Sequence, residues 1–286
     1  MLLGVADRWT GDWTELPAAV VAEVAALGYR VMNVRVRDPF TAPADAVART
    51  RDLYAAHGLV VGQTVGDYGG GLVHPDAHVR EAAIAFLARM CDLTARLGAR
   101  DTYLRPGSLH PDGAWLPHPG NRAPEVFDRL VGSVRRAAGA AEAAGVRLAL
   151  EAGVVSPVWS AARARDLIDA VGSPAVGFNL DPVNLVGSLP DAWDTTRLIA
   201  DCIARLGDVT IGAHAKDVRI VPGLLPAFAE AEIGDGVLDH VALLRGLAAV
   251  APDAHVLVEH LPPDRFAQAK ERMDAYAAAA GIAWGA

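Results

Sequence analysis

Four short apolar runs in the second half of the chain each end at a side chain that can bind a metal ion or transfer a proton. In chain order these side chains are Glu151, Asp181, His214 and Glu259. Three carboxylates and one imidazole, with no thiolate, form a ligand set suited to a hard or borderline divalent cation. We expect Mn²⁺, with Mg²⁺, Co²⁺ or Zn²⁺ as alternatives. The competing interpretation is that these residues are unrelated caps and solvated loop residues.

The elements that must position these residues alternate between short apolar runs and longer amphipathic segments. Strands are predicted at 2–6, 31–36, 59–65, 102–104, 146–150, 175–180, 209–213 and 255–258. Helical patterns follow them, and glycines such as Gly98 and Gly145 end several of these helices. Eight such units predict an α/β fold of the (β/α)8 TIM barrel type, as a single domain over residues 1–286. A doubly wound open sheet is the alternative. In a barrel the active site lies at the carboxyl ends of the strands, where all four side chains can converge.

Composition excludes several classes of protein. With 286 residues and 52% hydrophobic residues, the chain can bury a large core, which is not typical of a disordered protein. It has 26 basic and 34 acidic residues and a formal charge of −8, which argues against a nucleic-acid-binding protein. The two cysteines, Cys91 and Cys202, are too few for a disulfide framework and are expected to be buried free thiols. No leader or membrane-spanning pattern is present in the sequence, so we expect a cytoplasmic protein.

The order of short motifs resembles a known superfamily over nearly the whole chain. The segments that carry the resemblance are Leu148-Ala149-Leu150-Glu151, Gly177-Phe178-Asn179-Leu180-Asp181-Pro182, His214-Ala215-Lys216-Asp217, Gly234-Asp235-Gly236-Val237-Leu238-Asp239 and Val256-Leu257-Val258-Glu259. Together they resemble the xylose-isomerase-like TIM barrels. Within that superfamily they are most similar to the sugar-phosphate isomerase/epimerase group, which includes ketose 3-epimerases and inosose dehydratases.

The resemblance implies one divalent metal ion held by Glu151, Asp181, His214 and Glu259. It also implies that Glu151 and Glu259 act as the acid/base pair. This agrees with the chemistry of the residues, because a metal ion polarises a carbonyl and two carboxylates can remove and return the neighbouring proton. We therefore expect a metal-dependent isomerase or epimerase of carbohydrate metabolism that acts on a keto-sugar or polyol.

Two positions depart from the patterns of related proteins. Family members often have a histidine three residues after the aspartate of the sixth strand, where this chain has Asn184. The apurinic-site endonucleases of the superfamily need further histidines, whereas the third strand here offers Gln63 and no Asp-x-His pair follows His214. An endonuclease function is therefore disfavoured, and the link to typical ketose epimerases is weakened.

Further residues near the strand ends are candidates for binding substrate. We expect Arg105, and either Lys216 or Arg219, to bind a substrate oxygen or phosphate; the alternative is an ordinary surface loop. The indole rings of tryptophans in the predicted loops can cover the apolar face of a sugar, and Trp9 and Trp115 are the candidates for this contact. Asn184 is a further candidate for binding the substrate. By strand alternation His260 is expected to point away from the metal, and Asn179 to hydrogen-bond a metal ligand.

Two other functions remain open. A lyase, such as a dehydratase or an enzyme that cleaves C-glycosidic bonds, would use the same proton abstraction. A non-catalytic sugar-binding barrel would be expected to lack one or more of the metal-binding residues, and all four candidates are present in this sequence. The expected partner is a small carbohydrate, without nucleic acid or membrane, and the family indicates a homo-oligomer, either a dimer or a tetramer.

Overall fold

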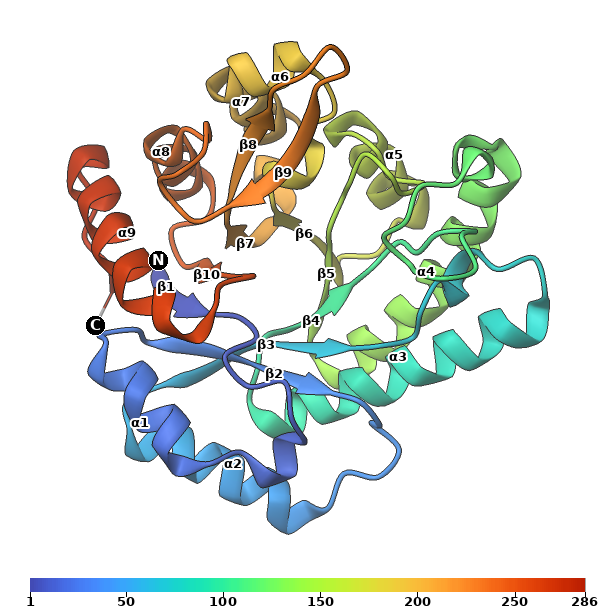
Figure 1. The fold of residues 1–286 in the computed structure, drawn as a ribbon. Coiled ribbons are helices and arrows are strands. Elements are labelled where there is room, and N and C mark those ends of the chain that lie inside the picture. The colour runs from blue at the N-terminus through green and yellow to red at the C-terminus, as the bar shows by residue number, and fades with distance from the viewer. Residues whose placement is uncertain (286) are drawn as a thin grey trace.

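The computed structural model describes residues 1–285, and these form a closed barrel of parallel strands. The barrel strands are β1 (Leu2–Val5), β2 (Val31–Val36), β3 (Val60–Gly66), β4 (Asp101–Leu104), β5 (Arg147–Leu150), β6 (Val176–Leu180), β7 (Thr210–Ala215) and β10 (His255–Val258). Around the barrel the order is β1-β10-β7-β6-β5-β4-β3-β2, and β1 closes it by pairing with both β10 and β2. Figure 1 looks into this ring of strands. The expected TIM barrel is confirmed.

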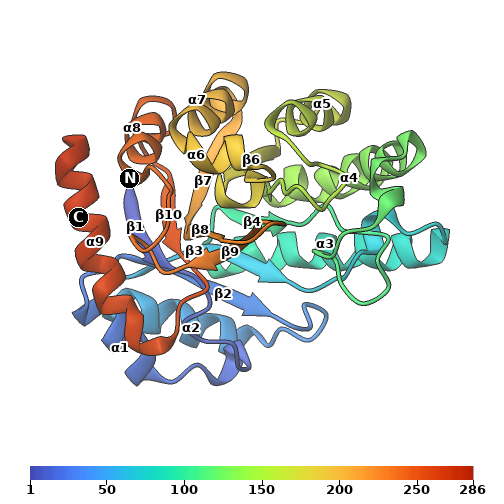
Figure 2. The same ribbon diagram turned by 45° about the horizontal axis from the view of Figure 1, so that its top comes forward.

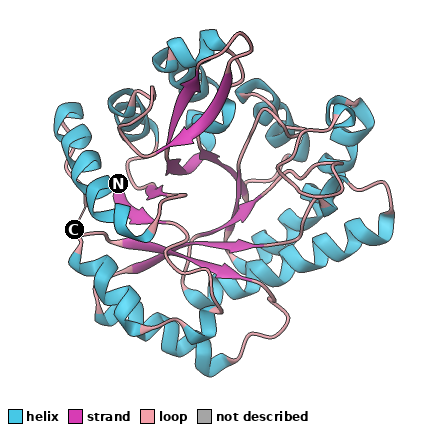
Figure 3. Ribbon diagram, in the orientation of Figure 1, coloured by secondary structure: helices cyan, strands magenta, loops and turns pink. Residues whose placement is uncertain are grey.

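Helices surround the barrel as an outer layer, drawn in cyan around the magenta strands in Figure 3. They are α1 (Ala18–Ala26), α2 (Ala44–Ala56), α3 (Ala77–Leu97), α4 (Pro124–Ala144), α5 (Ala161–Val171), α6 (Leu189–Trp193), α7 (Thr195–Leu206), α8 (His240–Val250) and α9 (Phe266–Ala280). Among the described residues, no helix combines the length and apolar character that a membrane span requires.

Local sequence explains where the long helices begin and end. The Asp76 carboxylate accepts a hydrogen bond from the backbone of His78 and caps the start of α3. At the other end Gly98 has a φ of 78°, and Gly145 after α4 has a φ of 69°. A side chain strains this left-handed conformation, so glycine is favoured at both points where the chain leaves a helix for a strand.

The core lies between the strands and the helices and inside the barrel. Leu148, Leu150 and Phe178 on β5 and β6 are fully buried, as expected for parallel strands covered on both faces. Because parallel neighbours are held in register, the ends of β5, β6, β7 and β10 reach the same rim.

The structure adds an antiparallel hairpin that the sequence pattern did not predict. Its strands are β8 (Asp217–Val221) and β9 (Ala227–Ala231), inserted between β7 and α8 at residues expected to form a loop. The hairpin is drawn in orange in Figures 1 and 2, and Phe228 and Glu230 on it line the cavity at the barrel mouth. The segment before β7 forms two helices, α6 and α7, and the Asp194 side chain caps the start of α7.

Candidate metal centre

The structure brings together the four residues expected to bind a metal ion. Each offers one ligand atom, and these atoms all lie within 4.8 Å of one another. All four side chains are buried. They are Glu151 after β5, Asp181 after β6, His214 within β7 and Glu259 after β10.

Strand register explains why these side chains meet. Leu257 of β10 pairs with His214 of β7, and the Glu259 backbone N–H then donates to the Ala215 carbonyl at 3.2 Å. On the other side, the Glu151 backbone N–H donates to the Leu104 carbonyl at 3.2 Å. The backbone of both glutamates is therefore fixed at the barrel rim, where their carboxylates face the same imidazole.

The orientation of the His214 ring leaves one nitrogen available to a metal. Its Nε2 lies 3.1 Å from Gln63 Oε1, and Gln63 Nε2 donates to the buried Asp101 carboxylate at 2.8 Å. An ionised carboxylate only accepts hydrogen bonds, so Asp101 turns the amide oxygen of Gln63 toward His214. Nε2 then carries a proton toward Gln63, and Nδ1 is the nitrogen that faces Glu151 Oε1 at 2.9 Å and Glu259 Oε2 at 3.1 Å.

Electrostatics in this cluster are strongly perturbed. Burial tends to lower the pKa of His214, but the carboxylates of Glu259 and Glu151 outweigh it and raise the pKa well above its ordinary value. Burial tends to raise the pKa of Glu259, yet His214 and Lys216 hold it well below its usual range. Burial, with the charges of Glu151 and Glu259, raises the pKa of Asp181 to about 7 against the opposing effect of Lys216. The cluster thus gathers three buried carboxylates around one imidazole and one ammonium.

A divalent cation fits the residues present. Asp181 Oδ2 and His214 Nδ1 are buried and make no regular hydrogen bond; their neighbours are ion-pair partners, the Lys216 ammonium for Asp181 and the carboxylates of Glu151 and Glu259 for His214. Buried polar atoms are usually hydrogen-bonded, so both atoms are available to a metal ion. Carboxylate oxygens and an imidazole nitrogen are donors that Mn²⁺, Mg²⁺, Co²⁺ and Zn²⁺ accept. These four residues can therefore hold one such ion.

Lys216 already supplies one positive charge to the cluster. Its buried ammonium lies 3.0 Å from Asp181 Oδ2 and 2.8 Å from Glu259 Oε1, with Glu230 Oε1 at 3.5 Å. The side chain lines the cavity, as expected for a substrate ligand, but these ion pairs hold its ammonium among the carboxylates.

Neighbouring side chains fix the orientation of Glu151. The Tyr103 hydroxyl donates to its Oε2 at 2.6 Å, and Asn179 Nδ2 donates to its Oε1 at 3.1 Å. The Asn179 contact agrees with the expectation that this residue hydrogen-bonds a metal ligand. Both donors are buried, so the carboxylate cannot rotate freely.

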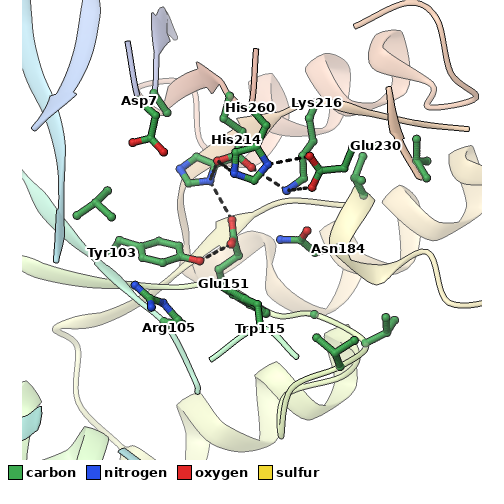
Figure 4. A pocket seen from close by; sticks show the side chains of 18 of the residues that line it. Asp7, Tyr103, Arg105, Trp115, Glu151, Asn184, His214, Lys216, Glu230 and His260 are labelled. Atoms are coloured by element: carbon green, nitrogen blue, oxygen red, sulfur yellow. Dashed lines mark hydrogen bonds and ion pairs between the residues drawn. The ribbon is translucent and has the colours of Figure 1, made fainter. Parts of the chain in front are cut away.

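A cavity of about 670 Å³ opens above this cluster and contains several of the expected substrate-binding residues. Arg105, Asn184, Lys216 and Trp115 line it, and Figure 4 shows them around Glu151 and His214. Arg105 comes from the end of β4, where its guanidinium pairs with Asp67 at 3.1 Å.

Two expected substrate-binding residues lie elsewhere. Arg219 is exposed on β8, where alternation turns it away while Val218 lines the cavity. Trp9 donates its indole N–H to the Asp12 carbonyl at 2.9 Å and does not line the cavity. Neither is retained as a candidate for substrate binding. Of the tryptophans expected near a sugar, only Trp115 lines the cavity within the described residues.

Sequence reasoning missed Glu230 and the orientation of His260. Glu230 reaches the site only through the unexpected hairpin, and its carboxylate contacts His260 Nδ1 at 2.9 Å. His260 has a φ of 56°, so it does not continue the strand alternation and lines the cavity, against the expectation that it points away. Asp7, which also lines the cavity, has a φ of 55°. Such strained residues cluster at functional sites, but no local sequence signal marks them.

Comparison with known proteins supports the same architecture. A search of curated proteins finds no match. Solved structures do match. A xylose isomerase-like TIM barrel protein from Mycobacterium smegmatis, in complex with magnesium, is 19% identical with a TM-score of 0.74, over 98% of this chain and 97% of that one.

Two epimerases also share the fold. D-psicose 3-epimerase from Clostridium cellulolyticum H10, solved with D-tagatose, is 17% identical with a TM-score of 0.70, over 98% of each chain. The 3-keto-D-glucoside 4-epimerase from E. coli, in its apo form, is 16% identical with a TM-score of 0.73, over 96% of this chain and 99% of that one. At these identities the likeness establishes the fold alone. The family model described as xylose isomerase-like TIM barrel matches residues 21–279, and the chain belongs to that family.

Proposed function

We propose that this protein is a divalent-metal-dependent isomerase or epimerase that acts on a keto-sugar or related polyol. The observation that carries the proposal is the convergence of four buried side chains able to bind a metal ion, two of them glutamates, of which Glu151, His214 and Glu259 line one cavity. Membership of a family whose solved relatives include sugar epimerases supports it.

Glu151, Asp181, His214 and Glu259 would hold the metal ion, for which we propose Mn²⁺. When bound, such an ion supplies Lewis acidity that polarises a carbonyl and stabilises negative charge on its oxygen. The buried setting strengthens that interaction because little water is present to screen it.

Glu151 and Glu259 are proposed as the acid/base pair. Each directs one oxygen toward His214 Nδ1, while its other oxygen is held by Tyr103 or Lys216. One carboxylate can therefore take a proton from carbon on one face of the sugar, and the other can return a proton to the opposite face. Inversion at that carbon is the expected result.

The cavity offers groups that can orient a carbohydrate. The Asn184 amide and the Arg105 guanidinium would bind hydroxyl oxygens, and the Trp115 ring would cover an apolar face of the sugar. We propose a small carbohydrate as the substrate on this basis.

A lyase that uses the same proton abstraction is the second candidate. It is favoured by the amide of Asn184 at a cavity position where related epimerases often have histidine. In a lyase the electrons left by proton removal expel a group on the adjacent carbon, so the product changes mass. A non-catalytic sugar-binding barrel is disfavoured because the ligand set is complete.

Proton exchange with solvent tests the proposal directly. The Mn²⁺-loaded protein is incubated with a panel of keto-sugars in D₂O, and products are analysed by NMR and mass spectrometry. An epimerase incorporates one deuterium at the carbon beside the carbonyl with inversion, and a lyase gives a product of lower mass. Glu259→Gln should abolish exchange, whereas Glu271→Gln, the same change at an exposed residue of α9 that does not line the cavity, should retain it. Deuterium incorporation by Glu259→Gln at the wild-type rate would contradict the proposed roles.

A further inference from the structure

The cavity above the metal ligands has two chemically different sides. The side formed by the ends of β1 to β4 carries most of the charged groups, Asp7, Asn33, Arg35, Asp67 and Arg105, beside Ala6 and Val65. The side formed by the loops after β4, β5 and β6 and by the hairpin is mainly apolar: Trp115, Val154, Val155, Val183, Val186 and Phe228, with Asn184 and Glu230 as its polar groups. In Figure 4, Asp7 and Arg105 lie to the left of Glu151, and Trp115 lies below it.

Hydrogen bonds hold the apolar side in place without any ligand. The Val154 backbone N–H donates to the Asn184 carbonyl at 2.9 Å, which joins the loops after β5 and β6. The buried Asn121 side chain donates to the Val155 carbonyl at 2.8 Å. Trp115 packs against Gly153 so closely that a Cβ at that glycine would lie 2.6 Å from the indole ring. A surface built in this way is preorganised for binding.

The cavity is larger than one free sugar requires. Even at the ~30 Å³ that a water molecule takes in the liquid, the twelve heavy atoms of a hexose would fill only about 360 Å³. The cavity measures about 670 Å³. A monosaccharide seated on Glu151 and His214 would therefore leave much of the apolar side in contact with water.

We propose that the apolar side is a subsite for an apolar, non-sugar substituent, so that the natural substrate is an aryl or alkyl glycoside that carries a keto group on its sugar ring, rather than a free sugar. The inference rests on the proposed function for the position of the sugar at the metal ligands. The sugar hydroxyls then face Asp7, Arg35 and Arg105, and the substituent lies against Val155, Val186 and the neighbouring apolar side chains. Each half of such a substrate meets a surface of matching polarity.

Calorimetric titration with matched glycosides tests this subsite. The Mn²⁺-loaded protein is titrated with the methyl and phenyl β-glycosides of glucose, galactose and xylose. For each sugar that binds, the phenyl glycoside should bind at least ~10-fold more tightly, since its ring buries apolar surface that the methyl group lacks.

Variants locate the preference on the apolar side. Val155→Asn should bring the ratio of phenyl to methyl affinity close to one. Phe228→Ser, on the hairpin, should lower it as well and provides a second measurement if the first variant folds poorly. Val60→Asn is the matched control, because Val60 is exposed at the start of β3 and does not line the cavity. It should keep the wild-type ratio.

The outcomes separate this inference from the proposed function. Equal affinities within each pair, absence of binding by every phenyl glycoside, or an unchanged ratio in both cavity variants would overturn the subsite. Titration of the apoprotein with Mn²⁺ alone tests the function: a phenyl preference in a protein that takes up no Mn²⁺ supports the subsite while contradicting the metal-dependent function. Mn²⁺ binding without a phenyl preference supports the metal-dependent function while contradicting the subsite.

Discussion

Replacement of Gln63 by leucine should weaken metal binding although Gln63 is not a ligand. Gln63 Oε1 accepts the Nε2 proton of His214 at 3.1 Å, and this contact leaves Nδ1 free to face the carboxylates. In Gln63→Leu the buried N–H has no partner, and the ring can rotate or change tautomer. The Asp101 carboxylate loses its donor at the same time.

The expected size of the effect follows from the burial of these groups. Gln63, Asp101 and His214 are all less than 8% exposed, so water cannot readily replace the lost contacts. A buried donor without a partner costs about 1–3 kcal/mol. Loss of partners to a ligating histidine typically lowers metal affinity by about 10–100-fold, or roughly 1.4–2.8 kcal/mol.

Calorimetric titration of the apoprotein with Mn²⁺ measures this effect. Gln63→Leu should bind Mn²⁺ about 10–100-fold more weakly than wild type. Gln63→Glu retains an acceptor for the imidazole N–H and should recover part of the affinity. Gln268→Leu makes the same chemical change on α9 and should have no effect. Wild-type affinity in Gln63→Leu, with the fold intact by circular dichroism, would refute this explanation of how His214 is oriented.

Three other predictions concern catalysis, acid stability and packing. Glu259→Gln should lower turnover by at least ~10²-fold, since it removes an acid/base group, and steady-state rates on the substrate found by deuterium exchange check this. Burial lowers the pKa of His255 to about 4, so between pH 6.5 and 4 the unfolded chain binds a proton that the folded protein excludes; stability should fall as the pH falls through this window. Urea unfolding at several pH values should show a smaller loss for His255→Gln. Phe178→Ala removes a fully buried aromatic ring on β6 and should lower the free energy of unfolding by about 3–5 kcal/mol. A urea unfolding curve that coincides with that of the wild type would contradict this prediction.

The barrel and the convergence of the four candidate ligands could be predicted because both depend on local patterns. Apolar runs separated by amphipathic segments, with glycines after α3 and α4, indicate repeated strand–helix units. Parallel strands in a closed barrel carry their carboxyl ends to one rim. A polar residue at the end of a strand, such as Asp181 after β6, is therefore placed at the site without knowledge of the other side chains.

The rest of the site depends on contacts that no local pattern encodes. Gln63 and His214 are 151 positions apart, and only barrel closure brings them within hydrogen-bond distance. The hairpin that carries Glu230 has no regular apolar alternation on β9, so its strands resemble a loop in the sequence. His260 turns into the cavity because its φ is 56°, whereas alternation along an extended strand predicts the opposite direction. The cavity position of Arg105 was predicted because it directly follows β4.

The four converging side chains are proposed to bind one divalent metal ion, and the proposed chemistry depends on that ion. Inductively coupled plasma mass spectrometry of the purified protein, after incubation with Mn²⁺ and removal of excess metal, measures this directly. We predict one divalent ion per chain in the wild type, its loss in His214→Ala, and its retention in His78→Ala, which changes an exposed histidine on α3. A wild-type protein that stays free of metal, or a His214→Ala variant that keeps the full amount, would contradict the proposed metal site.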